Sequence, residues 1–312
     1  MNFQQLRIIR EAVRRDLNLT EVAGALNTSQ SGVSKHIRDL EDELGVELFV
    51  RRGKRLVALT EPGRELVEIV ERMLLDAANI KRLADQFANV DRGALSIATT
   101  HTQARYTLPA VVASFKAAFP DVHLVLHQAS AAEITQMLLD GTADIGIATQ
   151  ALGEIADLIA FPYYTWHHAV VVPDGHPLLL DDALTLEAIA EHPIITYHEG
   201  YTGRSRIDEA FAAAGLVPDI VMSALDADVI KSYVELGLGV GIMASMAFDP
   251  ARDAGLQIVS SSHLFHENTA HIAVRRGRYL RGYAYRFIEL CSPGLDEKSI
   301  KAAAAVAADG SG

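Results

Sequence analysis

"LTEVAGALNTSQSGVSKHIRDLEDELG", residues 19–45, contains two short helical patterns separated by a polar break. Thr20 is expected to cap the first helix, because its hydroxyl can accept a hydrogen bond from a free backbone N–H. Apolar residues recur at helical spacing on one face of the second helix, and Gly45 is expected to end it. Two short helices joined by a turn of three or four residues form a helix-turn-helix, which we place at residues 19–38.

The other face of the second helix carries small polar groups and cations. A recognition helix needs such groups near its N-terminus to approach base edges, with cations beside them for phosphates. The following stretch, "VELFVRRGKRLVALT", predicts two short strands around a basic turn, which is the arrangement of a wing. A charged helix face or a basic hairpin alone is usually only solvated, but the two together behind a helix-turn-helix favour DNA binding. The residues expected to contact DNA are Gln30, Ser31, Ser34, Lys35, Arg38, Arg51, Arg52 and Lys54.

One long helical pattern follows, with an apolar stripe that includes Leu74 and Ile80. A stripe of this length needs a surface to cover it, and the same helix of a second subunit would provide one. The alternative is that the stripe packs on its own domain. We expect a dimer through this helix.

The sequence after Gly93 alternates between strand-like and helical segments, which indicates an α/β fold with parallel sheets and helices on both faces. Two units of this kind are expected, because the alternation continues through "AVVVP", "PIITY" and "GVGIMA". The last residues are of low complexity and are expected to be disordered. The chain is predicted to divide into a winged helix-turn-helix domain at 1–59, a linker helix at 60–92 and an effector domain at 93–312. Within the effector domain we expect subdomain I at about 93–162 and 267–292, subdomain II at about 163–266, and a disordered tail at 297–312.

The charge and the amino-acid composition of the chain limit which partners and which compartment are expected. The net charge of −12 is uneven: residues 1–92 contain 15 Lys+Arg and 15 Asp+Glu, and all of the excess acidic charge lies further along, so the first part is the less repelled by phosphate. The single cysteine, Cys291, excludes an internal disulfide and suits a reducing compartment. No apolar run approaches the roughly 20 residues needed to cross a bilayer, and the N-terminus has no signal-peptide layout. These features predict a cytoplasmic protein without a membrane partner.

A second group of polar residues follows strand-like segments of the effector domain. "TTHTQARYTLPA", residues 99–110, places hydroxyls and an amide, rather than charges, between a strand and a helix. Parallel sheets bind ligands at the carboxyl ends of their strands, where helix N-termini expose N–H groups. Neutral donors can hold an oxyanion at about 1.5–3 kcal/mol per bond, although a single threonine in such a place is more often only a helix cap. The residues expected to bind an effector are Thr100, Thr102, Gln103, Thr149, Trp166 and Thr202.

Residues 19–66 resemble the N-terminal winged helix of LysR-type transcriptional regulators. The resemblance rests on the serine–glutamine pair at 29–30, the serine before Lys35, the "LE…LG…LF…R" run and the "T…G" that opens the linker helix. Ser31 stands where many members carry proline. Further segments, among them "TTHTQARYTLP", "YHEGYTGRSRID" and "ELGLGVGIMASMAFDP", are similar to the CysB-like branch, which regulates cysteine biosynthesis and the use of sulfate and sulfonates.

The second resemblance spans nearly the whole chain. It implies a periplasmic-binding-protein-like effector domain whose pocket, between the subdomains, accepts sulfate at the six effector positions given above. It also implies a homotetramer built as a dimer of dimers on promoter DNA, with RNA polymerase as a partner at activated promoters. Expected effectors are small anions such as sulfate, thiosulfate, adenosine phosphosulfate or acetylserine, and no cofactor or metal is expected.

Other functions stay open at this point. The chain could be a LysR-type regulator of an unrelated pathway, a solute-binding protein with the same two-unit architecture, or an enzyme. The DNA-reading head and the missing signal peptide oppose the solute-binding protein. An enzyme would need a base beside the oxyanion donors, and only His101 is near, which strand alternation is expected to turn from the pocket. The sequence favours a regulator that senses a ligand.

Overall fold

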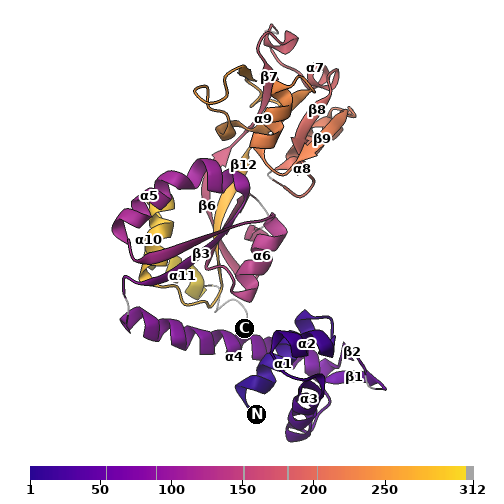
Figure 1. Ribbon diagram of the computed structural model, residues 1–312, viewed down its shortest axis with the longest axis vertical. Coiled ribbons are helices and arrows are strands. Elements are labelled where there is room, and N and C mark those ends of the chain that lie inside the picture. The colour runs from indigo at the N-terminus through magenta and orange to yellow at the C-terminus, as the bar shows by residue number, and fades with distance from the viewer. Residues whose placement is uncertain (54, 89, 150–151, 181–182, 202, 307–312) are drawn as a thin grey trace. The chain divides into compact units, whose positions relative to one another are not determined.

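The chain forms two compact units: Met1–Phe87 with Gly277–Tyr279, and Ala88–Arg276 with Leu280–Gly312. The short loop at Gly277 belongs with the first unit because Asn79 donates to Gly277 O (2.7 Å) and accepts from the Tyr279 N–H (2.8 Å). The computed structural model describes residues 1–53, 55–88, 90–149, 152–180, 183–201 and 203–306 (Figure 1).

The first unit begins with three helices that share one apolar core: α1 (Phe3–Arg14), α2 (Leu19–Ala25) and α3 (Gln30–Leu44). Helices α2 and α3 form a helix-turn-helix where the sequence predicts one. The capping residue differs, because Asn18 rather than Thr20 caps α2, with Asn18 Oδ1 accepting from the Thr20 N–H (3.2 Å). Ser29 caps α3, and Gly45 ends it in the left-handed conformation (φ 71°).

A two-stranded wing joins the helix-turn-helix to a long helix. Strands β1 (Phe49–Arg52) and β2 (Arg55–Leu59) are antiparallel, and α4 (Glu61–Ala88) follows. Gly63 lies so close to the wing that a Cβ there would collide with Leu48 O. Thr60 Oγ1 donates to Glu47 O (2.6 Å) and accepts from the Gly63 N–H (3.1 Å). The threonine and the glycine that open the linker helix therefore attach the wing to it.

The apolar stripe of α4 is covered along only part of its length. Val70 and Leu74 are buried against Leu6 of α1, whereas Ile80 and Phe87 are 70% and 80% exposed. The first half of the stripe thus packs on its own domain, as the alternative interpretation requires. The second half remains an exposed apolar face within this unit.

The second unit contains two five-stranded sheets, ordered β4-β3-β5-β12-β6 and β11-β7-β10-β8-β9. In each sheet three neighbouring strands are parallel and the other two are antiparallel to their neighbours. The prediction of parallel sheets is therefore wrong for β6, β7, β11 and β12, because the chain crosses from one sheet to the other through β6 and β7 and returns through β12. The strands are β3 (Gly93–Thr99), β4 (Val122–Gln128), β5 (Ile145–Thr149), β6 (Leu158–Trp166), β7 (His168–Pro173), β8 (Ile194–Tyr197), β9 (Ile220–Ala224), β10 (Val240–Ala244), β11 (Leu256–Val259) and β12 (Asn268–Arg275).

Helices cover both faces of each sheet. Phe115 of α5 and Phe287 of α10 pack on one face of the first sheet, and Ile134 of α6 packs on the other. Ile207 of α8 and Ile230 of α9 belong to separate core clusters on the second sheet. Within the described ranges, no helix is long and apolar enough to cross a membrane. The helices are η1 (Gln103–Thr107), α5 (Leu108–Ala118), α6 (Ala131–Asp140), η2 (Leu152–Glu154), η3 (Pro177–Leu179), α7 (Leu186–Ala190), α8 (Arg204–Ala213), α9 (Ala227–Glu235), η4 (Ser245–Ala247), α10 (Gly282–Cys291) and α11 (Glu297–Val306).

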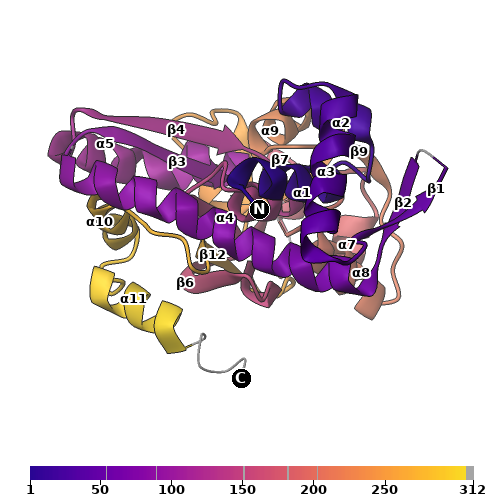
Figure 2. The ribbon, with the colours of Figure 1, turned by 90° about the horizontal axis from the view of Figure 1, so that it is seen from below.

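Two predicted boundaries differ from the structure. Strand β6 stays paired with β12 as far as Trp166, and β7 begins in the other sheet at His168, so the chain changes subdomain at His167 rather than after residue 162. The predicted disordered tail is instead helix α11 over Glu297–Val306 (Figure 2), with Ile300 only 2% exposed in the core of the first sheet. Alanine-rich sequence is low in complexity but has a high helix propensity. Residues 307–312 of the predicted tail lie outside the described residues.

Candidate functional site

The first two turns of α3 display the polar face that the sequence assigns to DNA. Gln30, Ser31, Lys35 and Arg38 are exposed, and Ser34 is half-buried. Arg38 donates to Ser34 Oγ (3.0 Å), so these two side chains form one hydrogen-bonded unit on the helix surface. The face combines small hydroxyl and amide groups with two cations, as a recognition helix requires.

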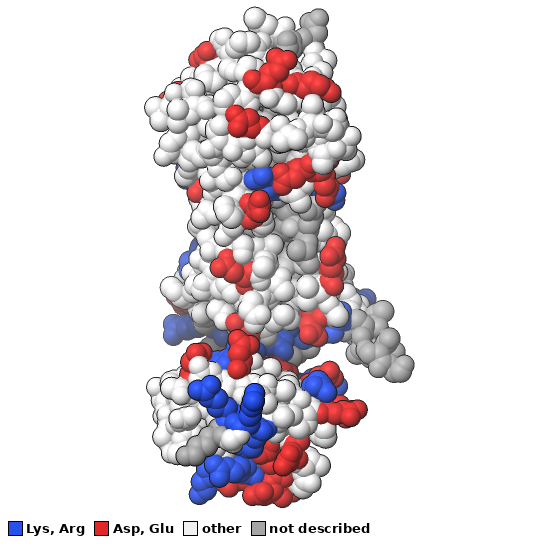
Figure 3. All heavy atoms as spheres, turned by 90° about the vertical axis from the view of Figure 1, so that its right-hand side faces the viewer, with Lys and Arg blue, Asp and Glu red and all other residues white. Residues whose placement is uncertain are grey.

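The wing carries exposed cations of two kinds. Arg52 and Arg55 extend from it without a partner among the ion pairs of the described residues, and Lys54 lies outside those residues. Arg51 instead donates to Glu41 Oε2 (2.6 Å), while Glu41 Oε1 accepts from the N–H of Leu48 (2.9 Å). Arg51 therefore ties the wing to α3, a role that the sequence did not suggest. Figure 3 shows Lys and Arg side chains gathered on the visible face of this unit.

In the second unit, three of the predicted effector-binding residues lie where β3 ends and a helix begins. Thr100, Thr102 and Gln103 are only 5%, 1% and 0% exposed. Thr100 Oγ1, Thr102 Oγ1 and Gln103 Nε2 have no hydrogen-bond partner among the described residues. Tyr197 lies beside Thr102, and burial raises the pKa of Tyr197, so its hydroxyl stays protonated. Buried polar groups are rarely left unpaired, and these three can donate to a ligand.

The amide of Gln103 is oriented by its neighbours. Tyr164 donates to Gln103 Oε1 (2.5 Å), and the Tyr164 oxygen lies 3.0 Å from Thr107 Oγ1. Burial raises the pKa of Tyr164, which keeps its hydroxyl protonated as a donor. With Oε1 occupied in this way, Nε2 is the group that Gln103 presents to a ligand. Alternation along β6 puts Tyr164 on the same side as Trp166, which is a signal in the sequence for this role.

Trp166 and Thr149 contact each other. The indole Nε1–H of Trp166 donates to Thr149 Oγ1 (3.3 Å), and both residues are buried. Because Thr149 accepts the indole proton, its own hydroxyl hydrogen is available to a ligand. In this structure Trp166 therefore contributes to the orientation of the Thr149 hydroxyl.

The loop before α8 approaches the same region. A Cβ on Gly203, whose φ is +70°, would come within 3.1 Å of the Trp166 ring and 2.7 Å of Asn268 Oδ1, so only glycine fits. Asn268 is completely buried, and its Oδ1 has no partner among the described residues. The sequence missed Asn268, although it opens strand β12 opposite Trp166. Thr202, which the sequence assigns to the pocket, lies outside the described residues.

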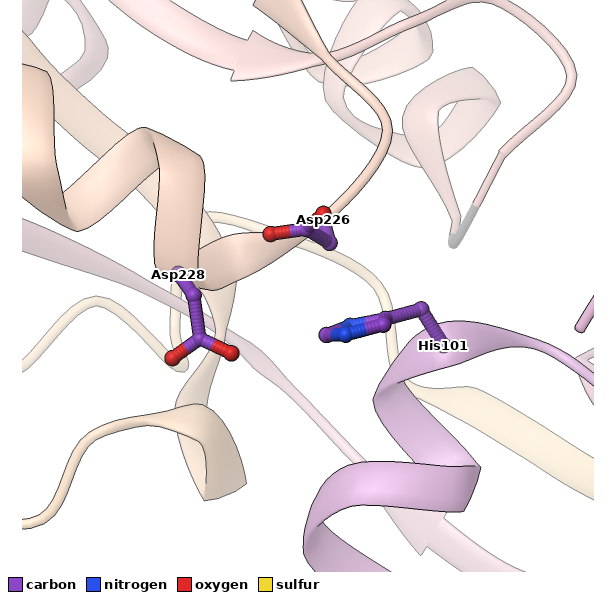
Figure 4. Close-up of side chains that lie close together, drawn as sticks. All are labelled: His101, Asp226 and Asp228. Carbon is purple, nitrogen blue, oxygen red and sulfur yellow. The ribbon is translucent and has the colours of Figure 1, made fainter.

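His101 does not follow the expected strand alternation, because residues 101–102 are already helical. Its imidazole faces Asp226 and Asp228 at the start of α9, and one side-chain atom of each residue lies within 4.8 Å of the others (Figure 4). Asp226 caps α9 by accepting from the Val229 N–H (2.9 Å). His101 thus faces the other subdomain, and the argument that alternation turns it away is wrong.

Together, a helix-turn-helix with a basic wing and an α/β domain with buried, unpartnered donors define a ligand-responsive DNA-binding regulator. The family described as "Bacterial regulatory helix-turn-helix protein, lysR family" matches residues 3–64, and "LysR substrate binding domain" matches residues 88–296. The chain belongs to the LysR family of transcriptional regulators.

Its relatives agree with the predicted branch. The chain is 60% identical over 300 residues to the "HTH-type transcriptional regulator SsuR" of Burkholderia cenocepacia, covering 96% of this chain and 97% of the relative. It is 56% identical to the regulator "cbl" of Escherichia coli K12 (96% and 95% covered) and 52% identical to CysB of B. cenocepacia (97% of each). The solved cofactor-binding domain of the Cbl regulator matches with a TM-score of 0.65 and 50% identity, over 67% of this chain and 92% of that one. The resemblance to CysB-like regulators is confirmed.

Proposed function

We propose that this regulator controls sulfur assimilation by sensing a small sulfur-related anion in its effector domain. The CysB-like branch regulates cysteine biosynthesis and the use of sulfate and sulfonates, and the match extends over the whole effector domain. The observation that carries the ligand class is the group of buried donors without partners at Thr100, Thr102 and Gln103. A fully ionised sulfate oxygen only accepts hydrogen bonds, so this group is complementary to it.

Reversible binding follows from the neutral donors. Each hydrogen bond to a charged oxygen contributes about 1.5–3 kcal/mol net, and no formal counter-charge is required. Thiosulfate, adenosine phosphosulfate and acetylserine also carry anionic oxygens that these donors could bind. Thr149 and Thr202 are proposed to complete the site, with Trp166 orienting Thr149.

Promoter DNA is the second ligand. The face of α3 formed by Gln30, Ser31, Ser34, Lys35 and Arg38 is proposed to read base edges and phosphates. Arg52 and Lys54 are proposed to contact the backbone from the wing, and Arg51 to hold the wing in place through Glu41. Two such heads are needed for a site with two half-sites, which agrees with an exposed apolar face on α4.

The assembly is proposed to be a dimer through α4 and then a dimer of dimers, acting in the cytoplasm and recruiting RNA polymerase at activated promoters. Ligand binding would favour one arrangement of the two subdomains, and this shift would change how the paired heads engage DNA. The protein is proposed to sense its ligand without transforming it.

Calorimetry on the full-length protein tests the effector. Sulfate, thiosulfate, adenosine phosphosulfate and O- and N-acetylserine should be titrated separately, followed by gel shifts on promoters of sulfur-assimilation genes with and without each bound ligand. Thr100→Val should weaken binding of the anion, whereas Thr135→Val, which removes a hydroxyl bonded only to Ala131 O on α6, should not. The competing function is a LysR-type regulator of another pathway. Binding of none of these anions, together with binding of an unrelated carboxylate at the same threonines, would establish it.

A further inference from the structure

Tyr106 belongs to subdomain I by sequence but packs in the core of subdomain II. It lies in the π-helical turn η1, between β3 and α5 of the first sheet. Its ring packs against the cluster that contains Ile195 of β8 and Ile230 of α9. Its hydroxyl donates to Asp228 Oδ1 on α9 over 2.7 Å. Tyr106 therefore joins the two subdomains through both an apolar and a polar contact.

The Tyr106 hydroxyl lies within a network of charged side chains. Lys231 is only 8% exposed, and its Nζ lies 3.3 Å from the Tyr106 hydroxyl oxygen and 5.4 Å from the centroid of the Tyr106 ring. The same Nζ donates to Asp253 Oδ1 (2.9 Å). Arg105 Nε lies 3.4 Å from Asp228 Oδ2. Burial pushes the pKa of Asp228 up, but the Tyr106 hydrogen bond and the charges of Lys231 and Arg105 hold it below its usual value. Asp228 is thus an ionised acceptor for a protonated tyrosine.

The same turn carries the effector donors. Gln103 opens η1 and presents its amide Nε2 as a ligand donor, and Tyr106 follows three residues later. A π-helical turn is uncommon and often marks a functional position, because it redirects side chains that an α-helix would stack. Here it sends Gln103 and Tyr106 to different partners from one rigid turn. Any shift of this turn that a ligand produces must be transmitted to α9, or break the Tyr106–Asp228 bond.

We propose that Tyr106 is a positioning residue that couples occupancy of the Thr100–Gln103 donors to the placement of α9 and thus of subdomain II. This inference rests on the proposed oxyanion function. His101, Asp226 and Asp228 also suggest a cation site by proximity (Figure 4), but Asp228 is already neutralised by Lys231 and Arg105, and Asp226 caps α9. These groups belong to the contact between the subdomains.

The test uses full-length protein with sulfate as the probe. Tyr106→Phe keeps the ring and removes the hydroxyl, and it should weaken sulfate binding by at least about fivefold in calorimetry. Asp228→Ala removes the acceptor and should have a similar effect, and the double variant should be no weaker than the single variants, because both changes break one bond. Tyr283→Phe is the control, since it removes a tyrosine hydroxyl of the same domain that donates to Ala94 O, away from α9.

Hydrogen exchange distinguishes coupling from general stability. Saturating sulfate should slow exchange in wild type both at residues 100–107 and at residues 226–235. In Tyr106→Phe the first segment should still be protected at saturation, and the second should not. Wild-type protection of both segments in the variants would overturn the inference alone. Failure of wild type to bind sulfate would overturn the oxyanion site and the coupling with it.

Discussion

The proposed DNA-reading face of α3 and the proposed effector pocket both contain hydroxyl and amide groups, but the exposure of these groups differs between the two. On α3 these groups are exposed or half-buried, and Ser34 is already bonded to Arg38. In the pocket Thr102 and Gln103 are buried, with donor groups that have no partner among the described residues. An exposed group on α3 would exchange a hydrogen bond to water for one to DNA and gain little, whereas a buried donor would gain more from a hydrogen bond to a charged oxygen.

This difference predicts how each site obtains its affinity. The reading head must add many weak contacts and must be used twice, on two half-sites. The pocket can obtain its affinity from a few strong hydrogen bonds. Variants that change one contact or one copy at a time test whether the two sites differ in this way.

The largest loss of DNA affinity is expected from a change at the surface of α4 that is proposed to join two DNA-reading domains. Ile80→Asp places a carboxylate on the exposed apolar face of α4 and should split the pair of helices, because an unpaired charge is costly to bury. Losing simultaneous binding of two heads should lower DNA affinity by about 100-fold or more. Light scattering should show a smaller mass, and a gel shift should show the loss. Leu74 is unsuitable for this test because it is buried within its own unit.

Lys81→Asp is the control for Ile80→Asp, because residue 81 is exposed and outside the apolar stripe. It should leave the mass and most of the DNA affinity unchanged. A wild-type mass for Ile80→Asp would show that α4 is not the interface, and that the heads are paired by another surface.

The next effect is the loss of one pocket donor. Thr102→Ala should weaken sulfate binding by about 1.5–3 kcal/mol, roughly 10- to 150-fold, while DNA binding without ligand stays close to wild type. Calorimetry gives the first value and a gel shift the second. Thr135→Ala on α6 should change neither. Equal sulfate affinity in Thr102→Ala and wild type would mean that these threonines only cap a helix.

Periodicity was sufficient to predict the elements that follow local rules. The helix-turn-helix, the wing and the alternating strands and helices agree with the structure, because each depends on residues close in sequence. Where two nearby residues were suitable for the same role, the prediction was wrong: both Asn18 and Thr20 are common N-cap types, and Asn18, which directly precedes Leu19, is the one that caps α2. Nothing between Trp166 and His168 resembles a turn, so the change of sheet at His167 was also missed.

Features that depend on the tertiary fold could not be predicted. Glu41 lies beside the apolar stripe of α3, and helical counting does not reveal that it binds Arg51 and two backbone N–H groups of the wing. Tyr106 joins a core cluster whose other members lie far along the chain. Strand-end position did predict that Thr100, Thr102 and Gln103 follow a strand together, but not that Tyr164 donates to Gln103.

A smaller effect is expected on the reading head. Lys35→Ala should weaken binding on all DNA sequences alike and reduce the salt slope by about one unit, since one phosphate contact is lost. Ser34→Ala should mainly reduce the preference for the target sequence, because it removes a hydroxyl that can reach a base edge and releases Arg38. Gel shifts over a range of salt, on target and random DNA, separate the two results. If both variants retain wild-type affinity and preference while folded, α3 does not dock as proposed.

The smallest effect concerns pH and tests Asp228, an ionised group at the contact between the subdomains. The native pKa of Asp228 lies below its usual value, so its contribution to stability is present above the unfolded value of about 3.9 and is lost as pH falls through the lower native pKa. The Tyr106 hydroxyl has its pKa raised by burial and stays protonated over the whole range from pH 5 to 8. The difference in thermal midpoint between wild type and Asp228→Asn should therefore be constant between about pH 5 and 8, and should shrink below about pH 4. Scanning calorimetry of both proteins at a series of pH values measures it. A difference that instead changes between pH 6 and 7 would show that a group other than Asp228 controls the contact between the subdomains.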